Sequence, residues 1–519
     1  METQQQQLPY RGAPFPSKWR RNHPRSKNGC MTCRSKRKKC DEAKPVCGGC
    51  VRTEQECVWP TPNGDRRDRQ LDSHTEGVLE SHFSQVNSSV YKVRAVSDDT
   101  NSLLSLRVAP TYGNLAYLSD DSKPLYQQYL DVTAEMLTRG PSECGNPFVN
   151  YLLPLASSNE LILDCVLAIG GAHLSINNSK ARGLEVATRG HYAKVLAGLQ
   201  TLLSYEIGQV TPGMVEQTTS TRTSQILLIL QLLCVYDHMH ANTRGAIYHH
   251  LKASREYISA LTSSYQPYDE LAYLRGFLLE MYTYHAMKLA LSPRNMLREE
   301  HVEIDPSVHS LDILDGYKSR GYLLGFGKSL FAMIPQIHQL VEARQEEERL
   351  GLGESTALRK QYEYLVAKLD AFDLYREDLD NPRPGQERVS STMIYQNALI
   401  VYLHSAFCPD MLLDVDLVTE LDERINKTVP AFMTLFVGDS PYRRMLLWPG
   451  VIMASCAQRE EHIRIFRAGL VGKAERTPGA VKTGARIVSL LWNDPDPQAF
   501  GPRGLSYVMT KHDISFGLC

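Results

Sequence analysis

Six cysteines at repeated spacing constrain this chain more than any other feature of its sequence. They lie between Cys30 and Cys57, where the pattern C-x2-C-x6-C occurs twice with six residues between the two units. So short a stretch can bury almost no apolar core and needs another source of stability. The N-terminus has no apolar stretch of the kind that a signal peptide carries, so we expect a reducing compartment, where crowded cysteines bind metal. Zinc is the expected ion, because it accepts four thiolates in a tetrahedron.

Counting ligand positions predicts two zinc ions. Two tetrahedral ions need eight positions, and six thiolates supply eight only if two of them bridge both ions. The repeat symmetry nominates the first cysteine of each unit as a bridge. The two ligand sets are then Cys30, Cys33, Cys40 and Cys47 for one ion, and Cys47, Cys50, Cys57 and Cys30 for the other. The alternatives are a disulfide framework and a one-zinc ribbon on the two C-x2-C pairs, which would leave Cys40 and Cys57 idle at the same offset in each unit.

The two six-residue spacers differ in charge. The spacer after Cys50 holds one base and two acids. The spacer after Cys33 holds five bases, which are Arg34, Lys36, Arg37, Lys38 and Lys39. Lys and Arg bind phosphates, and either can also bind guanine in the major groove, so we predict that the first spacer contacts double-stranded DNA. The alternative for such a run is a solvated surface or a nuclear-import signal.

The segment CMTCRSKRKKCDEAKPVCGGC resembles the fungal binuclear zinc-cluster family of transcription factors, Zn(2)Cys(6). The matching positions are Arg34, Lys36, Arg37, Lys39, Cys40, Asp41 and Lys44-Pro45-Val46-Cys47. The resemblance implies two short helices joined by a turn at Pro45, with Lys36 and Arg37 reading CGG-type triplets. It also implies a nuclear transcription regulator, and members of this layout often control a metabolic or secondary-metabolite gene set.

Charge and composition divide the chain into parts. Between residues 18 and 60, twelve Lys and Arg oppose four Asp and Glu, a net charge of +8, so the chain from residue 61 carries −9. We expect four regions: a disordered basic N-terminus (1–24), a Zn(2)Cys(6) DNA-binding domain (25–60), a flexible linker (61–118) and an all-helical regulatory domain (119–519). The linker lacks the three or four heptads of a coiled coil, so we predict that a fragment ending near residue 100 is monomeric. A homodimer formed through the helical domain stays open.

From residue 119 onward the apolar spacing is helical. We expect a helix after residue 160, capped by a box of Ser157 and Glu160, and another with Leu184, Val195 and Leu199 on one face. Further helices are expected near 222–240, 244–263, 268–291, 311–347, 357–376, 390–407, 418–436 and 444–469. The apolar run 226–236 is shorter than the ~20 residues that span a bilayer, so it indicates a core helix and no membrane partner.

The fold class predicted is therefore a small zinc-stabilised cluster domain plus a large all-α regulatory domain. NPFVNYLLPLASSNELILDCVLAIGGAHL and LLWPGVIMASCAQREE are similar to the helical regulatory region of one branch of the same family. That similarity implies a regulatory role, with a small-molecule effector or with partner proteins bound to a scaffold, and no catalytic residues.

Two other patterns suggest different chemistry. Residues 321–329, GYLLGFGKS, resemble a phosphate loop whose outer glycine is one residue too far away, inside a helical pattern and without a preceding strand. Asp237, His238, His240, His249 and His250 suggest either a second metal site or, as we favour, the polar end of a buried helix. The competing hypothesis for the whole chain is a one-zinc ribbon adaptor, or an enzyme with a degenerate phosphate loop.

Overall fold

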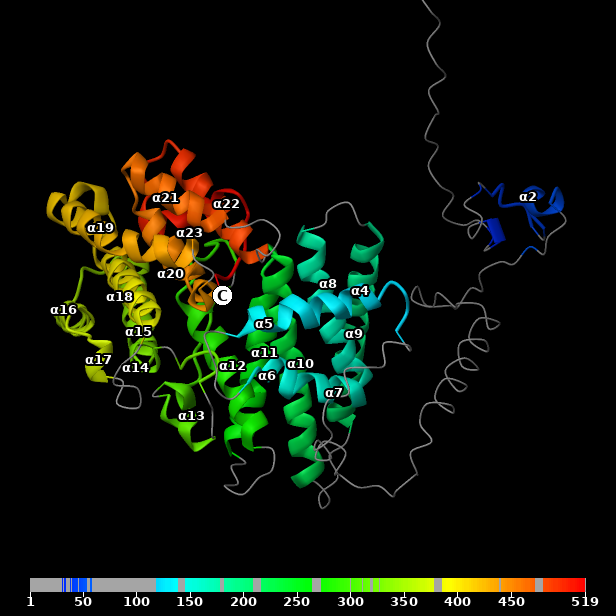
Figure 1. Cartoon of the computed structure of the whole chain (residues 1–519). Coiled ribbons are helices and arrows are strands. Elements are labelled where there is room, and N and C mark those ends of the chain that lie inside the picture. Colours follow the sequence, from blue (N-terminus) through cyan, green and yellow to red (C-terminus); the bar gives the residue numbers. More distant parts are fainter. Residues whose placement is uncertain are drawn as a thin grey trace, which may run out of the picture. The chain divides into compact units, whose positions relative to one another are not determined.

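The structure is a computed structural model, and its chain forms two compact units that divide at residue 97 (Figure 1). The residues that it describes are 30, 32–33, 38, 40–44, 46–53, 57, 118–138, 145–177, 182–208, 216–263, 272–298, 300–309, 311–317, 321–325, 327–377, 385–437, 440–471 and 479–518.

The described part of the first unit is built around cysteines rather than around aliphatic side chains. Its buried side chains are those of Cys30, Cys33, Cys40, Cys47 and Cys50, with Cys57 half-buried. The short helix α2 (Gly48–Val51) begins after Cys47, whose sulfur accepts a hydrogen bond from the N–H of Cys50. The first of the two helices expected here falls mostly outside the described residues.

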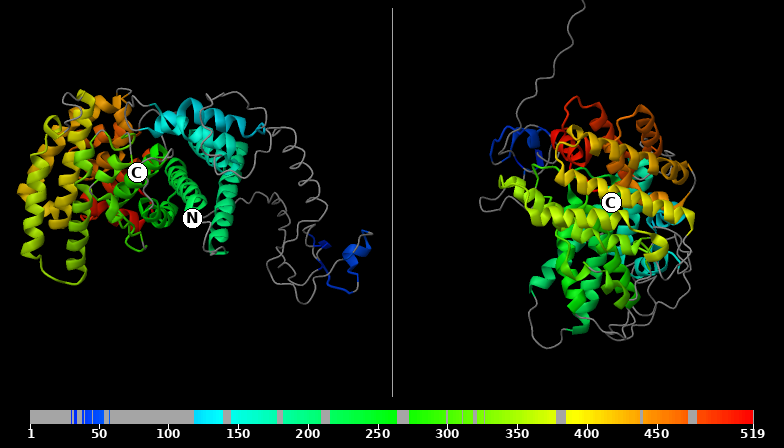
Figure 2. Two further views of the ribbon diagram at one scale, coloured as in Figure 1. Left: turned by 90° about the horizontal axis from the view of Figure 1, so that it is seen from below. Right: turned by 90° about the vertical axis from the view of Figure 1, so that its left-hand side faces the viewer.

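The second unit is helical, and among its described residues β pairing is limited to one isolated bridge between Arg244 and Ser515. Its first half contains α4 (Lys123–Gln128), a π turn (Tyr129–Thr133), α5 (Ala134–Leu137), α6 (Pro147–Asn150), α7 (Leu152–Ser158), α8 (Glu160–Asn177), α9 (Arg182–Gly208), α10 (Glu216–His240), α11 (Ala246–Ser263) and α12 (Ala272–Ala290). Figure 2 shows α8 to α12 as long helices that lie side by side.

The second half contains helices of between 4 and 23 residues. They are α13 (Asp312–Gly316), α14 (Lys328–Phe331), α15 (Ile334–Arg349), α16 (Thr356–Asp370), α17 (Leu374–Glu377), α18 (Gln386–Phe407), α19 (Val415–Val437), α20 (Leu447–Ser455), α21 (Glu460–Val471), α22 (Gly479–Asn493) and α23 (Gly501–Lys511). Single 3-10 turns lie at Pro306–Val308, Met411–Leu413 and Pro441–Met445.

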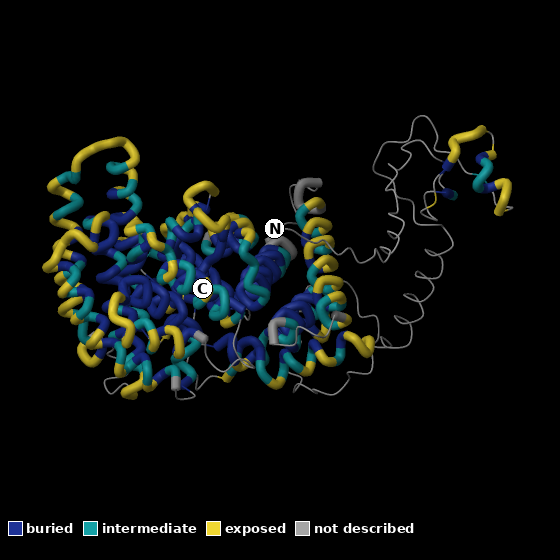
Figure 3. The backbone as a smooth tube through the Cα atoms, turned by 90° about the horizontal axis from the view of Figure 1, so that it is seen from above, coloured by how far each residue is buried: buried dark blue, intermediate teal, exposed yellow. Residues whose placement is uncertain are grey.

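Three helices that are buried on nearly every face form the core of the second unit. Residues 226–239 of α10 are buried, which confirms the core helix that the apolar run predicts. All of α20 is buried, as is nearly all of α12. Figure 3 shows dark blue, buried stretches of backbone in the interior and helices with yellow, exposed stretches around them. None of the described helices is both long and apolar enough to cross a membrane.

The predicted capping box of Ser157 and Glu160 ahead of α8 is wrong, because another residue caps this helix. Ser157 belongs to α7, where its hydroxyl donates to the carbonyl of Pro154. Asn159 caps α8 instead, because its side-chain oxygen accepts the N–H groups of Leu161 and Ile162 at 3.0 and 3.2 Å. Asparagine is a preferred N-cap residue, and here it lies between the end of α7 and the start of α8. The capping residue therefore depends on where the chain turns between the two helices, which the Ser-x-x-Glu pattern does not show.

Three of the helices expected from the apolar spacing are interrupted. The segment 311–347 contains α13, α14 and most of α15, the segment 357–376 contains most of α16 and of α17, and the segment 444–469 contains α20 and most of α21. Leu311 and Gly321 adopt positive φ angles of 61° and 67°, which an α-helix does not allow. Residues 322–324 are buried although they lie between two helices, so the apolar spacing there does not reveal the break.

Candidate zinc and DNA-binding site

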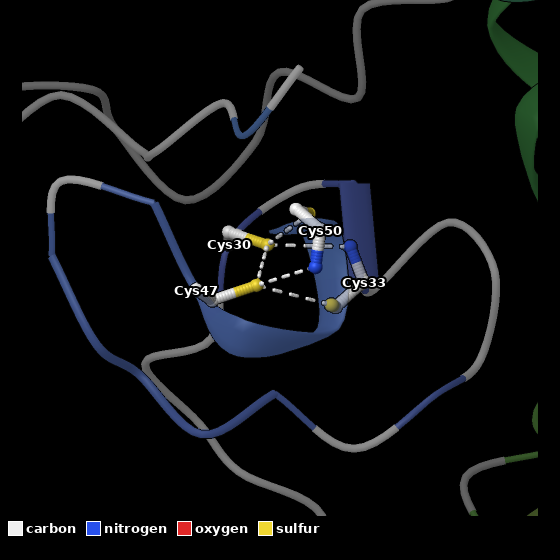
Figure 4. Close-up of side chains that lie close together, drawn as sticks. All are labelled: Cys30, Cys33, Cys47 and Cys50. Carbon is white, nitrogen blue, oxygen red and sulfur yellow. Dashed lines mark hydrogen bonds between the residues drawn. The ribbon is translucent and has the colours of Figure 1, made fainter. Parts of the chain in front are cut away.

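The cysteine sulfurs of the first unit converge at distances that fit shared metal ions. The sulfur of Cys47 lies 3.6 Å from that of Cys30 and 3.5 Å from that of Cys33 (Figure 4). The sulfurs of Cys30 and Cys50 are 3.8 Å apart. Two thiolates on one tetrahedral zinc, each with a Zn–S bond of ~2.3 Å, are themselves separated by about 3.8 Å. These sulfurs can therefore share an ion without rearranging the backbone.

The duplicated sequence unit produces duplicated hydrogen bonds. The N–H of Cys33 donates to the sulfur of Cys30 at 3.4 Å, and the N–H of Cys50 donates to the sulfur of Cys47 at the same distance. In the same way, the sulfurs of Cys40 and Cys57 accept the N–H groups of Cys30 and Cys47, at 3.4 and 3.3 Å. The two cysteines nominated as bridges therefore occupy equivalent positions, and N–H donors to sulfur stabilise the thiolate form that binds metal.

Hydrogen bonding favours the thiolate at the centre of the cluster. Burial opposes ionisation of Cys47, but bonds from the N–H of Cys50 and from neighbouring thiols lower its pKa to about 6. The hydrogen bond to Cys47, together with burial, raises the pKa of Cys33 to about 12. A metal must displace the protons of all its thiol ligands, and Cys47 is the thiol that releases its proton most readily.

The structure gives two groups of donor atoms close enough to hold an ion. One is Cys30, Cys33, Cys47 and Cys50, and the other is Cys40, Asp41 and Cys47. Sequence reasoning missed Asp41 as a neighbour of the cluster. Its carboxylate accepts the N–H of Gly48 at 2.9 and 3.1 Å, and a Cβ atom on Gly48 would lie 2.5 Å from that carboxylate. Asp41 therefore caps the start of α2, and a side chain at position 48 would require that carboxylate to move.

Most of the predicted DNA-contact residues fall outside the described residues: these are Arg34, Lys36, Arg37 and Lys39. Lys38 is described, and it is exposed, with its N–H donating to the carbonyl of Cys33 at 3.0 Å. Arg52 in the second spacer is exposed as well. DNA contact by the five bases of the first spacer stays a prediction.

The donors of the segment that resembles a phosphate loop are already occupied by the protein itself. The N–H groups of Tyr322, Leu323 and Leu324 donate to the carboxylate of Glu280 at 3.2, 2.6 and 2.9 Å. The ammonium of Lys328 binds Asp315 at 2.6 Å. A phosphate loop needs both its N–H groups and its lysine for the nucleotide, so this turn is a site for the chain's own carboxylate.

The second group of possible metal ligands is only partly brought together. His250 Nε2 lies 3.5 Å from the buried Asp237 Oδ2, and Asn242 donates to the other carboxylate oxygen at 3.0 Å. His240 instead stacks on Tyr236. The described residues around Asp237 do not provide three donor atoms within reach of one ion. The arrangement is that of a polar helix end packed against α11.

A chain of three polar groups that sequence reasoning missed joins α4, α8 and α9. The hydroxyl of Ser122 lies 2.9 Å from His191 Nε2, and His191 Nδ1 lies 2.6 Å from Asp164 Oδ1. The order of the groups is that of a hydrolase triad. Ser122 is only 5% exposed and also shares a 2.8 Å hydrogen bond with Ser119, so its hydroxyl serves the packing of three helices. The three residues are far apart in sequence and carry no local signal.

Comparison with known proteins places both units. Residues 28–66 match the fungal Zn(2)-Cys(6) binuclear cluster domain, and residues 124–513 match the fungal specific transcription factor domain. Transcription factor lfc1 of Flammulina velutipes is 40% identical over 82 residues, which are 16% of this chain and 26% of that protein. Transcriptional activator protein UGA3 of Saccharomyces cerevisiae is 28% identical over 163 residues, which are 30% of this chain and 31% of that protein.

Sterol uptake control protein 2 of Candida albicans is 48% identical over 40 residues, which are 8% of this chain and 6% of that protein. The chain therefore matches less than a third of the length of each of these three relatives. No solved structure matches the chain.

Proposed function

This chain belongs to the family of the fungal specific transcription factor domain and carries a Zn(2)-Cys(6) cluster domain. We propose that it is a DNA-binding transcription regulator rather than an enzyme, and that it acts in the nucleus on CGG-type triplets. The cluster binds two zinc ions. The observation that carries the proposal is the duplicated cysteine geometry with bases concentrated in one spacer.

The first step of the proposal is the assignment of the zinc ligands. Cys30 and Cys47 bridge the two ions, and each ion takes two further cysteines, Cys33 and Cys40 on one side and Cys50 and Cys57 on the other. The matched N–H to sulfur bonds of the two units support this assignment. When bound, the ions cross-link the segment and supply the folding free energy that its small apolar core does not.

The second step assigns the contacts with DNA. Lys36 and Arg37 read the base edges of a CGG-type triplet, because Arg and Lys can donate to guanine O6 and N7. Arg34 and the remaining bases of the spacer, Lys38 and Lys39, neutralise phosphates and release counterions. Lys38 is exposed, which supports its proposed contact with phosphates.

The third step concerns the helical unit. We assign residues 119–519 to regulation of the DNA-binding domain (25–60) through a linker at 61–118. A small-molecule effector, a homodimer partner or both would bind this helical unit. Its buried core helices and the charge contrast between head and body support a separately folded unit. A metabolic or secondary-metabolite gene set is the proposed target, and mapping the bound promoters genome-wide would identify it.

The test compares three arginine variants of the full-length, zinc-loaded protein. Arg37→Ala is expected to cost about 1–3 kcal/mol on a CGG-containing duplex and to relax base preference there, as loss of a guanine contact does. Arg34→Ala is expected to weaken binding to all sequences alike and to reduce the salt slope by about one. Arg52→Ala, in the second spacer, is the matched control and is expected to change little.

Fluorescence anisotropy on specific and random duplexes across a salt series measures all three. If Arg37→Ala and Arg34→Ala lost the same affinity on specific and random DNA, the division of roles between base and phosphate contacts would be wrong. If Arg52→Ala lost as much as Arg37→Ala, the assignment of DNA contact to the first spacer would be wrong.

A further inference from the structure

The helical unit contains a cavity of about 530 Å³ between α11 and the segment that follows α12. Its inner wall is apolar, because Tyr248, Leu251 and Val302 line it and are each less than 7% exposed. Met296 lines it from the outer side and is 69% exposed. The volume falls within the range of about 300–1,000 Å³ that is usual for small-molecule sites. Contact with an apolar ligand would remove the exposed side chain of Met296 from water, which is energetically favourable.

Four cationic side chains line the same cavity. Lys252 and Arg255 lie on α11, and Arg294 and Arg298 lie on the segment after α12. The guanidinium groups of Arg255 and Arg298 are about a third exposed, so they reach water as well as protein. Three of these cations already have acidic partners: Arg255 binds Glu303, Arg294 binds Glu342 and Arg298 binds Asp513.

The acids that line the cavity leave Lys252 without a partner. Glu303 binds Arg255. Glu300 is turned inward, where it accepts the hydroxyl of Ser515 and the N–H of Asn295, and burial raises the pKa of its carboxyl. Each of the three arginines is therefore paired with an acid, and among the described residues Lys252 is the lining cation that no acid binds.

Two of the cations keep donors for a ligand. Arg298 donates to Asp513 through Nε and Nη2 and to the carbonyl of Arg244 through Nη1, which leaves two of the five N–H donors of its guanidinium. Lys252 is exposed, and none of the described residues forms an ion pair or a hydrogen bond with its ammonium. Lys252 comes from α11 and Arg298 from the segment after α12, and both line the cavity.

We propose that this cavity binds a small organic anion that joins a carboxylate to an apolar body. Lys252 and Arg298 bind the carboxylate, and the wall of Tyr248, Leu251 and Val302 covers the body. This anion would be the effector of the proposed function. Only its role in regulation rests on the proposed function. Binding itself is independent of DNA.

The cavity wall is connected to the C-terminal residues, which gives occupancy a structural effect. The N–H of Met296 donates to the hydroxyl of Thr510 at 2.9 Å, and Arg298 binds Asp513. A ligand held by Lys252 and Arg298 links α11 to this wall and, through it, to the end of α23. A ligand that binds the folded state alone stabilises that state in proportion to its occupancy.

The test uses three probes with one apolar body and different head groups: 4-phenylbutyrate, 4-phenylbutyramide and 4-phenylbutylamine. Full-length zinc-loaded protein without DNA is titrated by calorimetry and followed by thermal unfolding. The carboxylate is expected to bind saturably in the millimolar range or tighter and to raise the melting temperature, whereas the amide and the amine are not. Lys252→Glu is expected to weaken carboxylate binding about tenfold or more, as loss of a charged hydrogen bond does.

Lys360→Glu is the matched control, because it makes the same charge change at an exposed position on α16, away from the cavity lining. It is expected to bind the carboxylate like the unchanged protein. Equal binding of the amide, unchanged binding by Lys252→Glu, or no saturable binding of 4-phenylbutyrate would each overturn the proposal. Affinity for a CGG duplex is measured separately, so a failure of the effector site is distinguishable from a failure of the proposed function.

Discussion

Replacing Glu280 by alanine tests how a single buried carboxylate organises the turn between α13 and α14. Glu280 lies on α12 with none of its surface exposed, and its two oxygens accept the N–H groups of residues 322–324. Those three residues are 2–4% exposed, so water cannot easily replace the lost acceptor. A buried donor that loses its partner carries its full desolvation cost.

The size of the effect follows from the three bonds. A hydrogen bond to a charged group contributes about 1.5–3 kcal/mol, but removing the carboxylate also removes the cost of burying its charge. We therefore expect Glu280→Ala to lower the free energy of unfolding by about 3–5 kcal/mol. With an unfolding entropy of ~2.1 cal/mol/K per residue over ~400 residues, the melting temperature of the helical unit should fall by about 4–6 °C.

Thermal unfolding followed by circular dichroism measures this shift, and Glu280→Gln is the matched control. Glutamine keeps the volume and one accepting oxygen, so it should lose about half as much as alanine. Formate, which is small enough to occupy the place of the carboxylate, should recover part of the loss in the alanine variant. Zinc content and DNA affinity of the head should not change. A melting temperature within about one degree of the unchanged protein would refute the role assigned to Glu280.

Three further predictions follow from the cluster, the linker and the buried Asp237. Native mass spectrometry should find two zinc ions per chain and fewer in Cys40→Ala, whereas one zinc that is unaffected by Cys40→Ala would favour the ribbon. Sedimentation velocity of a fragment ending near residue 100 should show a monomer at micromolar concentration, and a stable dimer would contradict the absence of a coiled coil. Burial raises the pKa of Asp237 to about 7, so the stability that this carboxyl contributes below about pH 4 is lost as the pH rises towards 7. The measured quantity is the melting temperature of Asp237→Asn minus that of the unchanged protein. This difference should rise between about pH 4 and pH 7 and stay level above pH 7. A difference that does not depend on pH would show that Asp237 does not titrate in this range.

The zinc cluster could be identified from the sequence because its chemistry is local. Six ligands within one short segment, at repeated spacing, specify the metal and its number with little help from the rest of the chain. The matched N–H to sulfur bonds of Cys30 and Cys47 repeat in space what the two C-x2-C-x6-C units repeat in sequence. The core helix at 226–236 was predictable for a similar reason, because a helix that is apolar on every face has no face to turn to water.

Other features depended on residues that the chain brings together from a distance. Glu280 interrupts the helix expected over 311–347 from a position 42 to 44 residues upstream of the N–H groups that it binds. Ser122, His191 and Asp164 meet only because α4, α8 and α9 pack together. The cationic cavity likewise needs Lys252 on α11 and Arg298 beyond α12. Local spacing encodes ligands and helix faces, whereas the partner of a buried polar group is decided by packing, because a desolvated charge must find its hydrogen bonds wherever the fold provides them.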